Sequence, residues 1–139
     1  VDRIRAVGTE RFRYIRNYLT DRAFYQSQYR DKHASIIELR RSYVDGEMTP
    51  LQASYMSAET RPEEELYDLE KDPDQLNNLA KDPEYASVLK KHRQILEEWI
   101  KKTGDQGQKI DSPEELKAVY DYAKGKVESP EYDFLRDDN

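Results

Sequence analysis

The stretch RPEEELYDLEKDPDQLNNLAKDPEYASVLKKHRQILEEWIKKTGD, residues 61–105, carries the strongest structural signals in the chain. Residues 65–69 (ELYDL) have the apolar and aromatic content of a short strand and follow a Pro that breaks any preceding helix. Asp82-Pro83 is a typical helix start, because Asp caps free amide groups and Pro fits the first helical position. This stretch therefore predicts a strand followed by a long helix.

The long helix, from 83 to about 102, is strongly amphipathic. Its apolar positions recur at spacings of three and four, and charged residues occupy the opposite face. We expect this face to pack on a sheet, with His92 and Trp99 both in the core. Asp72-Pro73 predicts one or two further helical turns. The apolar face consists of Tyr85, Val88, Leu89, His92, Ile95, Leu96, Trp99 and Ile100.

Upstream, residues 3–18 (RIRAVGTERFRYIRNY) alternate in the manner of two strands, with residues 8–11 as the turn of an antiparallel hairpin. The arginines of this hairpin have two interpretations. They form a solvated strand face, or they form a strip that faces an anion such as a sulfate or a carboxylate, for which the planar guanidinium fork is well suited.

Residues 19–33 have no periodicity and combine aromatic with basic side chains, among them Tyr25, Tyr29, Arg30 and His33. Such a loop either packs on a neighbouring domain or lines a cleft and contacts a ligand. His33 has no partner at metal-ligand spacing, because the only other histidine is His92.

Shorter helices are predicted at 34–44, from Thr49-Pro50 to near Ser57, and after Ser112-Pro113. The last residues are acidic, and we expect a docked or frayed tail. With the strands, these helices make the fold class α+β, as one domain by length. We place residues 1–108 in a subdomain and residues 109–139 in a helical extension and acidic tail of the same domain.

The composition narrows the function classes. The 139 residues are 36% hydrophobic and 37% charged, with a net charge of −6. The acidic balance argues against nucleic acid and anionic membranes as partners. The absence of cysteine excludes disulfides and thiolate chemistry. The chain opens with Val1 rather than Met, and we expect it to be part of a longer protein.

The quoted stretch resembles the C-terminal part of the type I sulfatases, the alkaline-phosphatase-like arylsulfatase family. RPEEELYDLEKDPDQLNNLA and DPEYASVLKKHRQILEEWIKKTGDQGQ carry the resemblance. RAVGTERFRYIRNY is similar to the hairpin that precedes them in those enzymes, with Gly8 where the family often has Arg. ELRRSYVDGEMTPLQASYMSAETRPEEELYDL further resembles the branch related to N-sulfoglucosamine sulfohydrolase.

The resemblance implies a small antiparallel sheet of about four strands with a long amphipathic helix packed across one face. It also implies a large N-terminal catalytic domain as the partner. That domain would hold the calcium and a formylglycine made from Cys or Ser in a C/S-x-P-S-R motif. Neither the motif nor any cysteine is present in these residues. We therefore assign no catalytic residue, metal ligand or cofactor to this chain.

Two main hypotheses follow. In the first, the chain is the C-terminal subdomain of a sulfatase that hydrolyses sulfate esters or N-sulfate groups of sugars; it is not catalytic alone, and it completes the fold and shapes the substrate cleft. The rim of that cleft would include Tyr25, Tyr29, Arg30 and His33. In the second, it is a free-standing module that binds an acidic sugar or a protein partner. An independent small enzyme is a weaker third hypothesis. By resemblance, the parent enzyme is periplasmic, secreted or lysosomal.

Overall fold

The computed structural model describes residues 2–26, 30–123 and 130–136. The chain divides into two compact units, Val1–Leu19 with Pro62–Ile110 and Thr20–Arg61 with Asp111–Asn139. In chain order, the elements are β1 (Ile4–Gly8), β2 (Phe12–Asn17), α1 (Ala34–Val44), α2 (Pro50–Ser57), β3 (Glu64–Asp68), η1 (Pro83–Tyr85), α3 (Ala86–Thr103), α4 (Pro113–Tyr122) and η2 (Pro130–Leu135).

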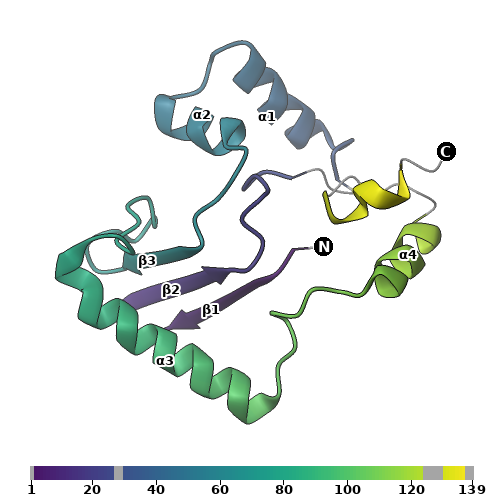
Figure 1. Cartoon of the computed structure of the whole chain (residues 1–139). Coiled ribbons are helices and arrows are strands. Elements are labelled where there is room, and N and C mark those ends of the chain that lie inside the picture. Colours follow the sequence, from purple (N-terminus) through teal and green to yellow (C-terminus); the bar gives the residue numbers. More distant parts are fainter. Residues whose placement is uncertain (1, 27–29, 124–129, 137–139) are drawn as a thin grey trace. The chain divides into compact units, whose positions relative to one another are not determined.

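The first unit is an antiparallel sheet of order β1-β2-β3 with α3 along one side of it (Figure 1). The register places Val7 opposite Tyr14, and Tyr14 opposite Leu66. Because side chains alternate across a strand, these three residues share one face of the sheet. This arrangement confirms the predicted α+β class. Among the described residues the sheet has three strands, where the resemblance implied about four.

The core of this unit lies between that face of the sheet and α3. Tyr14 and Leu66 are buried against Leu89 and Leu96 of α3, and partly buried residues such as Val7 surround them. Leu66 is 0% exposed and Tyr14 is 1% exposed, so the paired strand centres form the floor of the core. The predicted apolar face of the long helix is therefore confirmed.

His92 and Trp99 differ within that face. His92 is buried, with Nδ1 2.8 Å from the Val88 carbonyl oxygen and Nε2 3.3 Å from the Thr9 hydroxyl. Trp99 is 45% exposed, so the prediction that it lies in the core was wrong. Of the predicted stripe, Val88 and Ile100 are partly buried against the core cluster and Trp99 is not part of it, so helical periodicity alone did not determine which residues of the stripe reach the core.

Of the two predicted helix starts, Asp82-Pro83 begins a helix and Asp72-Pro73 does not. Asp82 caps the 3-10 turn η1 by accepting from the amide of Glu84, and α3 follows directly. Asp72 accepts from the amides of Leu76 and Asn77, yet no helix forms there. Gln75 instead has a left-handed φ of 57°, which interrupts a helical path. The predicted helical turns at Asp72-Pro73 were therefore wrong.

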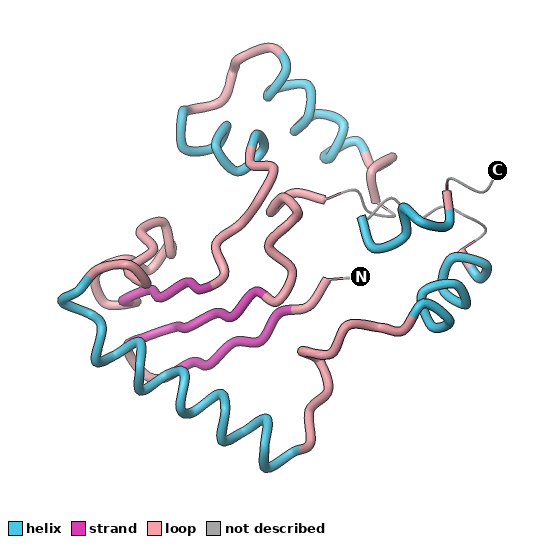
Figure 2. Tube along the Cα trace, viewed as in Figure 1, coloured by secondary structure: helices cyan, strands magenta, loops and turns pink. Residues whose placement is uncertain are grey.

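The second unit is helical in its described parts, and Figure 2 shows α1 and α2 as consecutive short helices. Thr49 and Gln52 form the predicted capping box of α2, and Ser112 and Glu115 form that of α4. On α4, Leu116 is buried, and the ring of Tyr120 lies 6.4 Å from that of Tyr132 in η2. None of the described helices has the length and apolar character required to cross a membrane.

Candidate functional site

The loop that precedes α1 holds the four residues predicted to line a cleft. Tyr25 is half-buried, whereas Arg30 and His33 are exposed. The amide of His33 donates to the carbonyl of Arg30 at 2.8 Å, which closes a turn, and α1 begins immediately after His33. Tyr29 lies outside the described residues. The turn therefore holds Arg30 and His33 near each other at the start of α1.

Tyr25 packs toward α1. The Arg40 guanidinium lies 5.5 Å from the centre of the Tyr25 ring, a cation–π distance, and pairs with Asp31 at 2.8 Å. The Asp31 carboxylate raises the pKa of Arg40, which stays fully charged. Arg40 of α1 thus contacts both Tyr25 and Asp31 of the loop.

Tyr25 also lines an open pocket, here called the α1–α2 pocket, with a volume of about 370 Å³. That volume lies within the usual range for sites that accept small groups. The Phe24 and Tyr55 rings form one wall, edge to face with centres 5.5 Å apart. The lining is apolar and aromatic, and it consists of Phe24, Tyr25, Leu39, Met48, Gln52, Tyr55 and Met56.

The sequence interpretation missed five residues of this pocket: Leu39, Met48, Gln52, Tyr55 and Met56. A signal for it exists in the sequence. Residues 48–58 (MTPLQASYMSA) contain no Asp, Glu, Lys or Arg in a chain that is 37% charged. A short helix without charged residues is typical of a surface that another part of the protein covers.

The arginines of the β1–β2 hairpin are engaged within the first unit. Arg5 forms two hydrogen bonds with Asp105, at 2.8 and 2.9 Å. Arg11 forms two with Asp68, at 2.6 and 2.9 Å, and Arg13 donates to Gln75 at 3.1 Å.

Arg16 pairs with Glu63 and lies 3.5 Å from Glu64, so its charge is also matched. These contacts favour a structural role over an anion-binding strip, because local carboxylates already neutralise most of the positive charge.

The same pairs set the charge state of the carboxylates. Arg93, aided by Arg16 and the Tyr14 hydroxyl, lowers the pKa of Glu64 to about 2. Arg11 lowers the pKa of Asp68, and Arg5 lowers that of Asp105. All three are therefore anionic near neutral pH. They act as fixed partners for guanidinium groups rather than as proton donors.

A second polar cluster lies on the sheet face opposite α3. Glu65 is buried and accepts from the Asn17 amide at 2.6 Å and from the Tyr67 hydroxyl at 2.5 Å. Asn17 also donates to the carbonyl of Pro62 at 2.8 Å. Both carboxylate oxygens thus have donors, which offsets the cost of burial. The cluster joins β2 to the start of β3.

The residues present do not fit the groups expected of a sulfatase centre. Within residues 2–26, 30–123 and 130–136, no three His, Cys, Asp or Glu side chains gather as a metal site would require. The sequence also lacks Cys and the C/S-x-P-S-R pattern from which formylglycine is made. No step of sulfate hydrolysis is therefore assigned to residues of this chain.

Comparison with known proteins identifies the family. The chain is 39% identical over 105 residues, 75% of its length, to an ulvan-active sulfatase of Formosa agariphila. It is 50% identical over 42 residues to a delta 4,5-hexuronate-2-O-sulfatase of Bacteroides thetaiotaomicron, and 46% identical over 44 residues to a second ulvan-active sulfatase of Formosa agariphila. No family model matches the chain.

The chain belongs to the sulfatases and corresponds to a C-terminal region of such an enzyme. The matched residues span 17% of the first relative and 9% of each of the other two. Most of each relative therefore has no counterpart in these 139 residues.

Proposed function

We propose that this chain is the C-terminal subdomain of a sulfatase that hydrolyses sulfate groups of sugars, and that it is not catalytic alone. The observation that carries the proposal is the 39% identity over 105 residues with an ulvan-active sulfatase. Catalysis would reside in an N-terminal domain, the partner of this chain, with calcium and formylglycine. The parent enzyme would be periplasmic, secreted or lysosomal.

The substrate class follows from the names of the relatives. They act on ulvan and on a delta 4,5-hexuronate 2-O-sulfate, which supports a sulfated, uronate-containing sugar with an O-linked sulfate as the first candidate. An N-sulfated glucosamine is the second candidate, supported by the resemblance of residues 38–69 to the N-sulfoglucosamine sulfohydrolase branch.

The contribution of this chain would be structural and positional. The β1–β3 sheet and α3 would complete the fold of the enzyme, and residues Tyr25, Tyr29, Arg30 and His33 would form part of the cleft rim. Exposed Arg30 and His33 side chains at one turn suit contact with an anionic sugar. We further propose that residues 1–108 are the subdomain and residues 109–139 an extension of the same domain.

The test compares the full-length protein that contains these residues with the 139-residue chain. Each is incubated with calcium and with 2-O-sulfated unsaturated uronate disaccharides, ulvan oligosaccharides and N-sulfated glucosamine, and the released sulfate is measured. We expect release by the full-length protein only. Sulfate release by the 139 residues alone would refute the proposal that catalysis resides in the N-terminal domain. No release by the full-length protein would refute the sulfatase assignment.

A free-standing binding module is the second candidate. The observation that favours it is the exposed Arg30 and His33 turn, which does not need a catalytic domain to bind an acidic sugar. Direct titration of the 139-residue chain with the same sugars separates the two functions, because the subdomain hypothesis predicts no measurable binding by the chain alone.

A further inference from the structure

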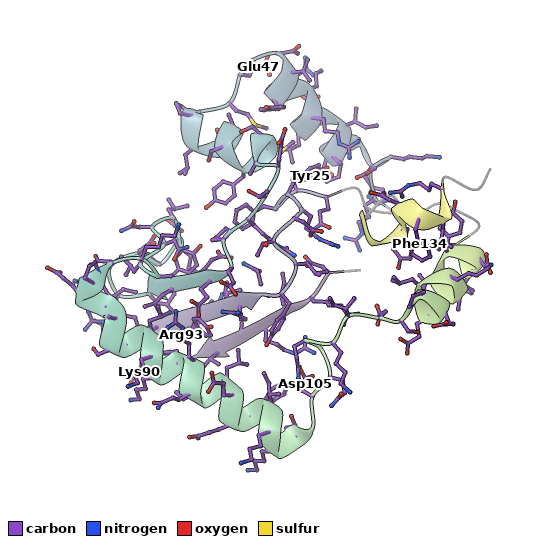
Figure 3. All side chains as sticks on the ribbon, viewed as in Figure 1. Tyr25, Glu47, Lys90, Arg93, Asp105 and Phe134 are labelled. Atoms are coloured by element: carbon purple, nitrogen blue, oxygen red, sulfur yellow. The ribbon has the colours of Figure 1, made fainter. Side chains whose placement is uncertain are left out.

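We propose that the α1–α2 pocket is a docking surface that receives an apolar side chain from the rest of the sulfatase polypeptide. The inference deepens the proposed function and rests on it, because it needs the remainder of the enzyme as its partner. Figure 3 labels Tyr25 at the pocket and Glu47 in the turn before α2. Three observations support the proposal.

The first observation is the distribution of charge. The two longest stretches without Asp, Glu, Lys or Arg are residues 48–58 and residues 23–29. Both stretches contribute to the pocket, with Met48 and Tyr55 from the first and Phe24 and Tyr25 from the second. Depletion of charge together with enrichment in Tyr, Phe and Met is the composition of the buried centre of a protein interface.

The second observation is the exposure of α1 and α2. No residue of either helix is fully buried, although both carry large apolar side chains. Leu39 is 39% exposed, Leu51 45% and Ile37 55%. Helices of 11 and 8 residues are marginal without tertiary packing. An apolar face of this kind requires a covering partner.

The third observation identifies the partner. The matched residues account for 17% of the ulvan-active sulfatase, so most of such an enzyme is available to cover this face. A sulfated sugar suits the pocket poorly, because the lining has no charged side chain, and only Gln52, Tyr25 and Tyr55 carry polar side-chain groups. Methionines such as Met48 and Met56 adapt their shape to an inserted apolar side chain.

Docking at this pocket would also fix the preceding loop. Tyr25 lines the pocket, and the Arg40 guanidinium lies 5.5 Å from the centre of its ring. A group seated in the pocket would hold Tyr25, and with it the turn of Arg30 and His33. Docking would thereby set the position of the proposed rim.

The test uses the full-length enzyme with a photo-crosslinking amino acid at position 51. Leu51 lies on α2, next to Gln52 of the pocket. The matched control is position 76, because Leu76 is 50% exposed and lies in the other compact unit. Crosslinked peptides are identified by mass spectrometry.

We expect position 51 to crosslink within one polypeptide to residues outside the 139, and position 76 to crosslink there at least tenfold less. Crosslinks between two copies, crosslinks confined to the 139 residues, or no crosslinks at all would overturn the proposal. This measurement does not depend on sulfate release. An enzyme without sulfatase activity would therefore refute the proposed function, and the crosslinks would still test the docking proposal.

A charge placed at the same position provides a second measurement. Leu51→Lys should lower the Tm of the full-length enzyme by several degrees, because a lysine there would be buried at the interface without a partner. Leu76→Lys should leave the Tm within about one degree, as expected for an exposed surface change. Equal shifts for the two variants would overturn the proposal.

Discussion

Arg93 on α3 and Glu64 on β3 form a two-pronged ion pair, in which Nε donates to Oε1 at 2.6 Å and an Nη donates to Oε2. The Tyr14 hydroxyl also donates to Oε1, at 2.7 Å. Glu64 thus joins the central strand, the edge strand and the helix at the border of the core. This contact adds a directional link between α3 and the sheet to the apolar packing of the core.

Glu64→Gln should destabilise the first unit by about 1–2 kcal/mol, because it removes a charge-assisted bidentate pair and leaves Arg93 without an anion. The matched control is Glu63→Gln: the neighbouring side chain is 63% exposed and should contribute less than about 0.5 kcal/mol. Urea denaturation followed by tryptophan fluorescence of Trp99 measures both. Equal losses would show that the Arg93 pair has no special role.

The same pair predicts an acid dependence. The pKa of Glu64 in the folded protein is lowered to about 2 from an ordinary value of 4.5, so the folded state holds this proton less tightly than the unfolded state. The stability contributed by Glu64 is complete above about pH 4.5 and is lost as the pH falls toward 2. The stability difference between the parent and Glu64→Gln should therefore shrink between pH 5 and pH 2. A constant difference would contradict the assignment.

Gly107 lies against the Arg5–Asp105 pair. A Cβ at position 107 would come 1.7 Å from an Arg5 Nη, so Gly107→Ala should displace the guanidinium and break the pair. We expect a lower Tm, by a few degrees, in a thermal melt. Gly8→Ala is the control, because a Cβ there meets nothing within 4 Å. A similar Tm for both alanine variants would mean that the pair does not hold the end of α3 to β1.

Trp99 and Leu96 lie on the same helix and differ in burial. Leu96 is 5% exposed in the core, and Leu96→Ala should cost about 2–5 kcal/mol. Trp99 is 45% exposed, and Trp99→Ala should cost about 1–2 kcal/mol from the apolar area that it still covers. Denaturant unfolding monitored by circular dichroism gives both values. A larger loss for Trp99→Ala would indicate that the helix margin is covered in solution.

The proposed rim makes a kinetic prediction. Arg30→Ala in the full-length enzyme should raise KM for a sulfated oligosaccharide by about three- to tenfold with little change in kcat, because uniform binding energy is lost. Arg41→Ala is the control, because Arg41 is an exposed arginine of the same unit that lies outside the proposed rim. An unchanged KM for Arg30→Ala would remove Arg30 from the rim.

Local rules predicted much of this fold. The caps at Thr49 and Ser112, the hairpin strands and the stripe of α3 depend on neighbours within a few residues, and all of them were confirmed. Trp99 was misplaced because periodicity gives the direction of a side chain but not whether that residue reaches the core. At Asp72, a capping side chain was present, but the chain turned at Gln75 through a left-handed conformation that no local rule required.

The candidate site was less predictable than the fold. The turn of Arg30 and His33 follows from the start of α1, which the sequence indicates. The α1–α2 pocket is lined by residues of the loop before α1, of α1, of the turn before α2 and of α2. Contacts between residues so far apart in sequence depend on tertiary packing, which local patterns do not give. The pairing of Arg5 with Asp105 spans 100 positions and was likewise beyond local patterns.

The order β1-β2-β3 has a consequence for how the chain folds during synthesis. The β1–β2 hairpin closes over a short turn, whereas β3 joins β2 only after residues 18–63 have been made. Until β3 has been synthesised, one edge of the central strand β2 has no strand to pair with. The helix α3, which covers the sheet, is synthesised after β3. Closing a longer segment costs only about 0.6 kcal/mol for each doubling of its length. The segment between β2 and β3 can thus lengthen or shorten in evolution at little thermodynamic cost. The remaining constraint on its length is the time during which the unpaired edge of β2 is exposed in translation.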